Sequence, residues 1–167
     1  MPIVERTRFL VPPGGGEAIW AGPIGTIVTV SPEATGGALS VCEMPVAVGY
    51  MVPTHTHRDT DEWSYVLEGR IGARVGDDEF TAGPGSWILK PSGVMYTFWN
   101  AGPAPARIIE LLTPGRFERF FRQIAALASR DELDDAVMRV LAAEYGTTVA
   151  MDWVEELTAR YGLQVTI

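Results

Sequence analysis

Short apolar runs that alternate with polar residues, broken by Gly or Pro every few positions, fill residues 1–112. The clearest of these runs are 26–30, 38–42 and 107–111. They have the length and the period of β-strands, and no helical periodicity longer than a turn interrupts them. We therefore predict an all-β unit, either a sandwich or a closed barrel, over 1–112, with hairpin turns at 75–78 and 82–85.

The periodicity becomes helical after Thr113. Pro114 suits the first position of a helix, and apolar residues then recur at three- and four-residue steps from Phe117 to Leu127. This pattern predicts a first helix whose apolar face packs against another part of the protein.

Two more helices are expected further along the chain. The segment 129–132 (Ser-Arg-Asp-Glu) has the form of a capping box and predicts the start of a second helix that ends before Gly146. A third is expected from near Asp152 to Gly162. So short a segment could hardly bury three apolar helix faces alone, so we predict that 113–167 is an appendage packed on the barrel.

Composition restricts the function classes. Lys+Arg 13 against Asp+Glu 21 gives a net charge of −8, and the pI is about 4.7, which argues against nucleic acid as a partner. No apolar run is long enough to span a bilayer, the N-terminal segment 1–10 lacks the apolar block of a secretory signal, and Cys42 is the only cysteine. We expect a soluble cytoplasmic protein that acts on a small molecule.

The only two histidines, His55 and His57, stand two residues apart. On a strand this spacing projects both rings from one face, and Glu62, at the start of the next predicted strand, can bring a carboxylate to the same point. Two imidazoles and a carboxylate suit Fe, Mn, Ni, Co or Zn, with positions left open for substrate. Two surface histidines beside an acidic turn would give the same local sequence, so the spacing alone does not decide between these interpretations.

The surrounding residues match a longer pattern. Residues 49–69 fit G-x5-H-x-H-x4-E-x6-G without a mismatch, and 85–100 fit G-x5-P-x-G-x2-H-x3-N except that Tyr96 stands in place of the histidine. These are similar to the two motifs of the cupin superfamily, and the resemblance extends over about 36–112. Residues 114–121 resemble the tail of small cupins similar to bacterial quercetin dioxygenases. The resemblance implies a double-stranded β-helix, a jelly-roll barrel, with a C-terminal helical extension.

The resemblance also implies roles for individual residues. His55, His57 and Glu62 take the role of metal ligands, and Tyr96 points at the same centre. A phenol must lose its proton to ligate, so three arrangements are open: a three-ligand site with Tyr96 as proton donor, a four-ligand site with tyrosinate, and a site without metal. Without metal, Glu62 beside a histidine could still act as an acid/base pair.

Other aromatic residues are assigned from strand alternation. Phe98 shares a face with Tyr96 and is expected to form an apolar wall of the pocket. Four other aromatic residues are expected on the outer face, at a dimer seam or against the helical tail: Trp63, Tyr65, Trp87 and Trp99. The resemblance implies a homodimer that pairs through its sheets. Lys90, the only lysine, precedes Pro91 and is expected to be a solvated turn residue.

Three functions follow as hypotheses. The first is a metal-dependent enzyme acting on an aromatic or polyketide-like small molecule, with quercetinase-like oxygenation as the reaction. The second keeps the metal as a Lewis acid in a non-redox cyclase, isomerase or lyase. The third is a metal-free barrel that binds a small ligand.

Overall fold

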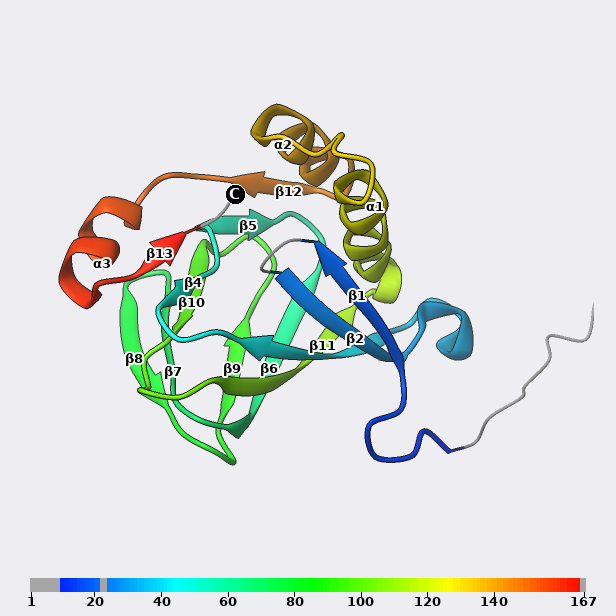
Figure 1. Ribbon diagram of the computed structural model, residues 1–167, viewed down its shortest axis with the longest axis horizontal. Helices are drawn as coiled ribbons and strands as arrows, with labels where there is room; N and C mark the ends of the chain where they lie inside the picture. The colour runs from blue at the N-terminus through cyan, green and yellow to red at the C-terminus, as the bar shows by residue number, and fades with distance from the viewer. Residues whose placement is uncertain (1–9, 22–23, 166–167) are drawn as a thin grey trace, which may run out of the picture.

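Two β-sheets face one another in the computed structural model, which describes residues 10–21 and 24–165 (Figure 1). The first sheet is formed, in spatial order, by β1 (Glu17–Ala21), β2 (Ile24–Val30), β3 (Ser40–Val46), β11 (Ala106–Thr113), β6 (Asp61–Glu68) and β9 (Trp87–Lys90). The second contains β8 (Asp78–Ala82), β7 (Ile71–Val75), β10 (Tyr96–Asn100), β4 (Tyr50–Met51), β5 (His55–His57), β12 (Thr147–Val149) and β13 (Gln164–Val165). Strands β4 and β5 both pair with β10, while β12 pairs with β5 and β13 with β4.

The predicted all-β architecture is confirmed. Run 26–30 lies in β2, run 107–111 lies in β11, and 38–42 overlaps β3. Alternation sets the inside of the barrel: along β11 every second residue is buried, from Ala106 to Leu112, as expected for a strand with one face on the core. The same alternation along β6 turns Glu62 and Ser64 inward.

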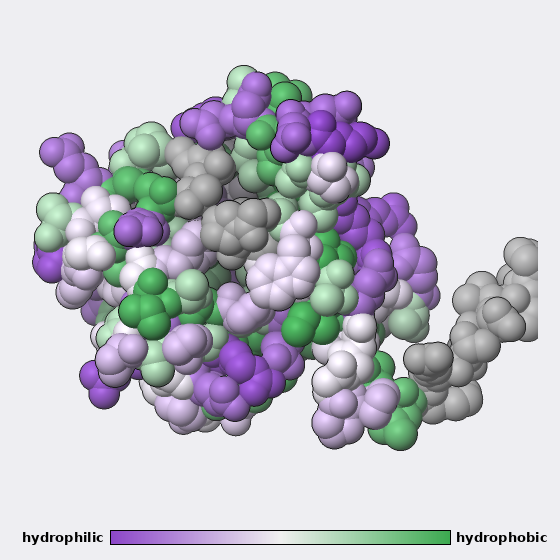
Figure 2. All heavy atoms as spheres, viewed as in Figure 1, coloured by the Kyte–Doolittle hydropathy of each residue, from purple (hydrophilic) through white to green (hydrophobic). Residues whose placement is uncertain are grey.

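Four short helices follow β11 in the described part of the chain: η2 (Gly115–Phe117), α1 (Glu118–Ala128), α2 (Asp135–Glu144) and α3 (Val154–Tyr161). One more short helix, η1 (Pro32–Thr35), lies earlier, between β2 and β3. Among the described residues, no helix is long and apolar enough to cross a membrane. Hydrophilic residues gather over the upper edge of the face drawn in Figure 2, where α1 and α2 lie.

The helices bury their apolar sides against the barrel. Phe121 and Ile124 of α1 and Leu141 of α2 share one core cluster with Ile19 of β1 and Val28 of β2. This arrangement explains why such short helices are stable, because most helical stability in proteins comes from packing.

The α3 helix forms a second contact with the barrel. Val154 and Leu157 pack on Trp99 of β10 and Met51 of β4. The segment after Thr113 also contributes β12 and β13 to the second sheet, which the sequence analysis did not predict because strands of two or three residues show no period.

The third predicted helix ends at Gly162 as expected, but the capping box predicted for the second helix is wrong. The α2 helix begins at Asp135, and the carboxylate of Asp134 accepts a hydrogen bond from the Val137 N–H at 2.8 Å. Ser129 instead continues the last turn of α1, where its N–H donates to the Ala125 carbonyl at 3.0 Å. Asp134 has the extended backbone of a true cap, with φ −125° and ψ 177°.

These two positions give a matched pair of variants. Asp134→Ala removes the cap and is expected to lower the free energy of unfolding by about 1 kcal/mol. Ser129→Ala is expected to change it by less than about 0.5 kcal/mol, because Ser129 is exposed, starts no helix and loses only a solvent-exposed hydrogen bond from its hydroxyl to the Ala126 carbonyl. Urea unfolding followed by circular dichroism measures both, and an equal loss in the two variants would contradict the assignment of the cap.

Candidate metal centre

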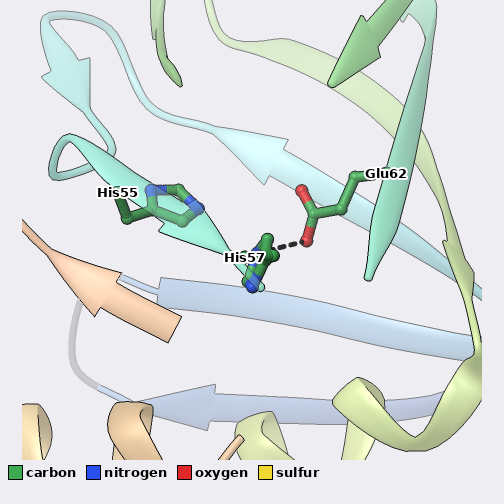
Figure 3. Close-up of side chains that lie close together, drawn as sticks. All are labelled: His55, His57 and Glu62. Carbon is green, nitrogen blue, oxygen red and sulfur yellow. Dashed lines mark ion pairs between the residues drawn. The ribbon is translucent and has the colours of Figure 1, made fainter. Parts of the chain in front are cut away.

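His55, His57 and Glu62 converge inside the barrel (Figure 3). The first two project from one face of β5, and Glu62 reaches them from β6 in the facing sheet. One ligand atom from each residue lies within 4.8 Å of the others. Ligands that share one ion lie at most about 4.4 Å apart, so this cluster has nearly the size that a divalent transition metal requires.

Tyr96 lies between two of these side chains. Tyr96 is the direct partner of His55 in the pairing of β10 with β5, and the oxygen of the Tyr96 hydroxyl is 2.8 Å from His55 Nε2. The same hydroxyl donates to Glu62 Oε2 at 2.5 Å. Because a phenol carries a single proton, it can satisfy only one of these two acceptors at a time.

Hydrogen bonds fix the state of the His55 ring. Its Nδ1 lies 2.6 Å from the Pro53 carbonyl oxygen, which can only accept, so Nδ1 carries the proton and Nε2 presents a lone pair. Burial, and then the neighbouring His57, lower the pKa of His55 to about 4. His55 is therefore a neutral imidazole at neutral pH.

His57 provides the sharpest indication of a ligand site. The residue is 1% exposed and its Nδ1 hydrogen bonds to Thr147 Oγ1 at 2.7 Å, but its Nε2 has no hydrogen-bond partner among the residues that the structure describes. That atom lies 3.2 Å from Glu62 Oε1. Two ring nitrogens and a carboxylate oxygen thus face one point, and this donor set fits a divalent transition metal.

Lys90 is not the solvated turn residue that the sequence analysis expected. It lies in β9, is 1% exposed, and points into the barrel beside Glu62, its cross-strand partner. Its Nζ is 3.0 Å from Glu62 Oε2 and 2.7 Å from Glu110 Oε1. The prediction failed because it relied on Pro91, whereas the phase of the strand places Lys90 on the same inward face as Ile88.

The ammonium group controls the charge of the centre. Burial alone would raise the pKa of the Glu62 carboxyl, but Lys90 and then His57 lower it well below its usual value. Burial would likewise lower the pKa of Lys90, but Glu110 and Glu62 raise it. Lys90 is therefore a cation and Glu62 an anion in the folded protein. Burial, followed by Glu62, holds the pKa of Tyr96 well above its usual value.

Two further residues of the site were missed. Glu110 of β11 accepts hydrogen bonds through Oε1 from Lys90 Nζ at 2.7 Å and from the hydroxyl of Ser64, its cross-strand partner, at 2.8 Å. Thr147 is supplied by β12. The alternation of β11 could have revealed Glu110, since it shares a phase with Ile108 and Leu112, whereas nothing in the local sequence marks Thr147.

A cavity of about 110 Å³ lies beside the centre and under α1 and α2. His55, Glu62, Phe98 and Glu110 contribute to its wall from the strands. The rest of the cavity wall is mostly apolar. The barrel contributes residues that include Met44, Val46, Tyr50 and Val52. The helical segment contributes Phe117, Phe120, Phe121, Ile124, Met138 and Ala142.

The aromatic residues take the positions that alternation predicts. Phe98 is buried beside Tyr96 and lines the cavity. On the outer face of β6 and β9, Trp63 and Trp87 are exposed, and Tyr65 packs against Trp87 with ring centroids 4.9 Å apart. Trp99 is buried under the α3 segment.

Comparisons with known proteins agree on the fold. The model of the Cupin domain family matches residues 42–112. A search of curated proteins finds no match to the sequence. The structure of KdgF from Halomonas sp. superposes with a TM-score of 0.55 at 17% identity, covering 62% of this chain and 92% of that chain.

Two other solved structures are similar. A protein from Thermotoga maritima described as a predicted oxalate decarboxylase has a TM-score of 0.53 at 19% identity, over 58% of this chain and 90% of its own. The cupin domain of Cnp3 from Schizosaccharomyces pombe has a TM-score of 0.54 at 14% identity, over 75% of this chain and 82% of its own. At these identities the likeness concerns the fold alone. The two facing sheets and the similar solved structures together show the double-stranded β-helix fold, and residues 42–112, less than half of the chain, match the Cupin domain family.

Proposed function

We propose that the protein is a small metal-dependent cupin enzyme that acts on an aromatic or polyketide-like small molecule. The observation that carries this proposal is the buried His57 Nε2, which has no hydrogen-bond partner within residues 10–21 and 24–165 and faces the Glu62 carboxylate beside an apolar cavity. His55, His57 and Glu62 would hold Fe, Mn, Ni, Co or Zn. Such an ion would polarise a substrate oxygen and, if redox-active, would also allow chemistry with dioxygen.

The protein's own residues supply proton transfer and binding. Tyr96 holds a proton between His55 Nε2 and Glu62 Oε2 and is the proposed proton donor to the substrate, with Glu62 as its partner. Phe98 provides a flat apolar wall. The helical segment 113–167, which we propose to be an appendage of the 1–112 barrel, keeps water from the cavity through residues such as Phe117.

Metal and oxygen dependence test the reaction. We expect elemental analysis of the purified protein to find a transition metal, and chelation to lower its melting temperature. We expect oxygen uptake with a flavonol or a 1,3-diketone, as in quercetinase-like oxygenation. Turnover without oxygen would replace this proposal with a non-redox cyclase, isomerase or lyase. Failure of every metal to bind would leave a metal-free ligand-binding barrel.

The role of Tyr96 is tested by Tyr96→Phe. We propose the three-ligand arrangement, so zinc affinity should be unchanged and turnover should fall by roughly 10²- to 10⁴-fold. Calorimetry at pH 7 in buffers of different ionisation enthalpy counts the protons released on zinc binding. His55 contributes none, because its pKa of about 4 leaves it neutral. Wild type and variant should therefore release equal numbers.

One additional proton released by the wild type would instead identify tyrosinate as a ligand. Full turnover in Tyr96→Phe would remove the role of proton donor.

We also propose that the protein is a homodimer that pairs through the outer face of β6 and β9. Trp63 (39% exposed) lies opposite Leu89 (47%), and Tyr65 lies opposite Trp87 (51%), which makes one continuous apolar patch. A cytoplasmic location is proposed as well, and the buried free thiol of Cys42 agrees with a reducing compartment.

The dimer is tested by light scattering coupled to size exclusion. The wild type is expected at twice the chain mass of 18.2 kDa, and Trp87→Glu is expected at the mass of one chain. Phe80→Glu is the control, because Phe80 is also an exposed aromatic residue (38%) but lies on β8 of the other sheet. A monomeric wild type, or equal effects of both variants, would contradict the proposed interface.

A further inference from the structure

The carboxylate of Glu110 has one oxygen that the protein does not use. Glu110 is 2% exposed, and its Oε1 accepts hydrogen bonds from both Lys90 and Ser64. Its Oε2 is buried and has no partner within the part of the chain that the structure describes. A buried acceptor left in this state costs free energy, so the group is expected to have a function.

The side chain of Glu110 lies at the wall of the cavity. Glu110 lines the cavity together with His55, Glu62 and Phe98. The two donors on Oε1 fix the orientation of the carboxylate, so Oε2 is presented in one direction and does not alternate with Oε1. Burial raises the pKa of Glu110, but the Lys90 ammonium, 2.7 Å from Oε1, opposes this and favours the ionised carboxylate, which accepts hydrogen bonds and donates none.

The lining of the cavity restricts which chemical groups can donate a hydrogen bond to Glu110 Oε2. Aromatic and aliphatic residues form most of the wall, including Val46, Phe98 and Phe120. Lys90 already compensates charge here, since it bridges Glu110 to Glu62. A neutral donor on an apolar body therefore fits better than a second ammonium group.

We propose that Glu110 is a substrate-binding residue whose Oε2 accepts a hydrogen bond from a hydroxyl group carried on an apolar or aromatic molecule. The proposal builds on the proposed function and narrows its substrate class to hydroxyl-bearing apolar compounds. A site of this kind discriminates strongly against isosteres without the hydroxyl, because these would leave the buried oxygen unpaired. Lys90 and Ser64 are positioning residues that hold the carboxylate.

Three small probes test the acceptor: phenol, toluene and anisole. Toluene has the shape of phenol without the donor, and anisole has an ether oxygen that only accepts. An apolar cavity alone would favour toluene, since the phenol hydroxyl must leave water. With Glu110 as acceptor, phenol is expected to bind roughly tenfold more tightly than toluene or anisole, because only phenol can donate a hydrogen bond to the charged carboxylate.

The measurement is calorimetry or ligand-observed NMR on the metal-free and the zinc-loaded protein. Glu110→Gln directs an amide N–H₂ into the cavity, because Lys90 and Ser64 retain the amide oxygen, and it should therefore raise the affinity for anisole relative to phenol about tenfold. Ser64→Ala is the matched control: it removes a donor to the same carboxylate but leaves Oε2 in place, so the preference for phenol should persist. Thermal unfolding of each variant verifies that it is folded.

The proposal is overturned if the wild type binds toluene or anisole as tightly as phenol, if it binds none of the three, or if Glu110→Gln keeps the preference for phenol. These results are separable from the metal proposal. A preference for phenol in a protein that binds no zinc would support Glu110 and refute the metal site. Zinc binding without a preference for phenol would support the metal site and refute the proposed role of Glu110.

Discussion

The ammonium of Lys90 is the charge on which the interior of this barrel depends. Two carboxylates, Glu62 and Glu110, are buried between the sheets, and Lys90 contacts both, at 3.0 Å and 2.7 Å. A carboxylate of this kind is expensive to desolvate, and removing its partner typically costs about 3–5 kcal/mol. The lysine thus allows an anionic ligand residue to stay ionised inside an apolar shell, where it can face the two imidazoles.

Strand register assembles the centre. Four of its contacts join residues that are direct partners across neighbouring strands: Glu62 with Lys90, Ser64 with Glu110, His55 with Tyr96, and His57 with Thr147. Because the side-chain period of a strand is two, a slip of one residue in any strand would turn its member of the centre to the other face. The apolar residues that share these phases, such as Val66 and Ile108, oppose such a slip and so hold the polar groups in place.

The sequence contained most of the fold and part of the centre. Strand-length runs predicted the sheets, and the spacing of His55, His57 and Glu62 predicted the convergence of the three side chains only together with the longer motif over 49–69. Lys90 was misassigned because local turn residues were given more weight than the phase of β9. Thr147 and β12 could not be predicted, since a three-residue edge strand has no period of its own and exists only because β5 offers an open edge.

The C-terminal segment connects the centre to the cavity. Thr147 orients the ring of His57 through Nδ1, and Phe117, whose ring centroid lies 4.3 Å from that of His57, packs beside the same imidazole. Both residues also line the cavity, so the extension holds the ring of His57 and at the same time forms part of the cavity wall. This hydrogen bond engages Nδ1, so Nε2 is the ring nitrogen that faces Glu62. The barrel therefore supplies His55, His57 and Glu62, whereas the extension holds the ring of His57 and forms part of the wall of the cavity beside them.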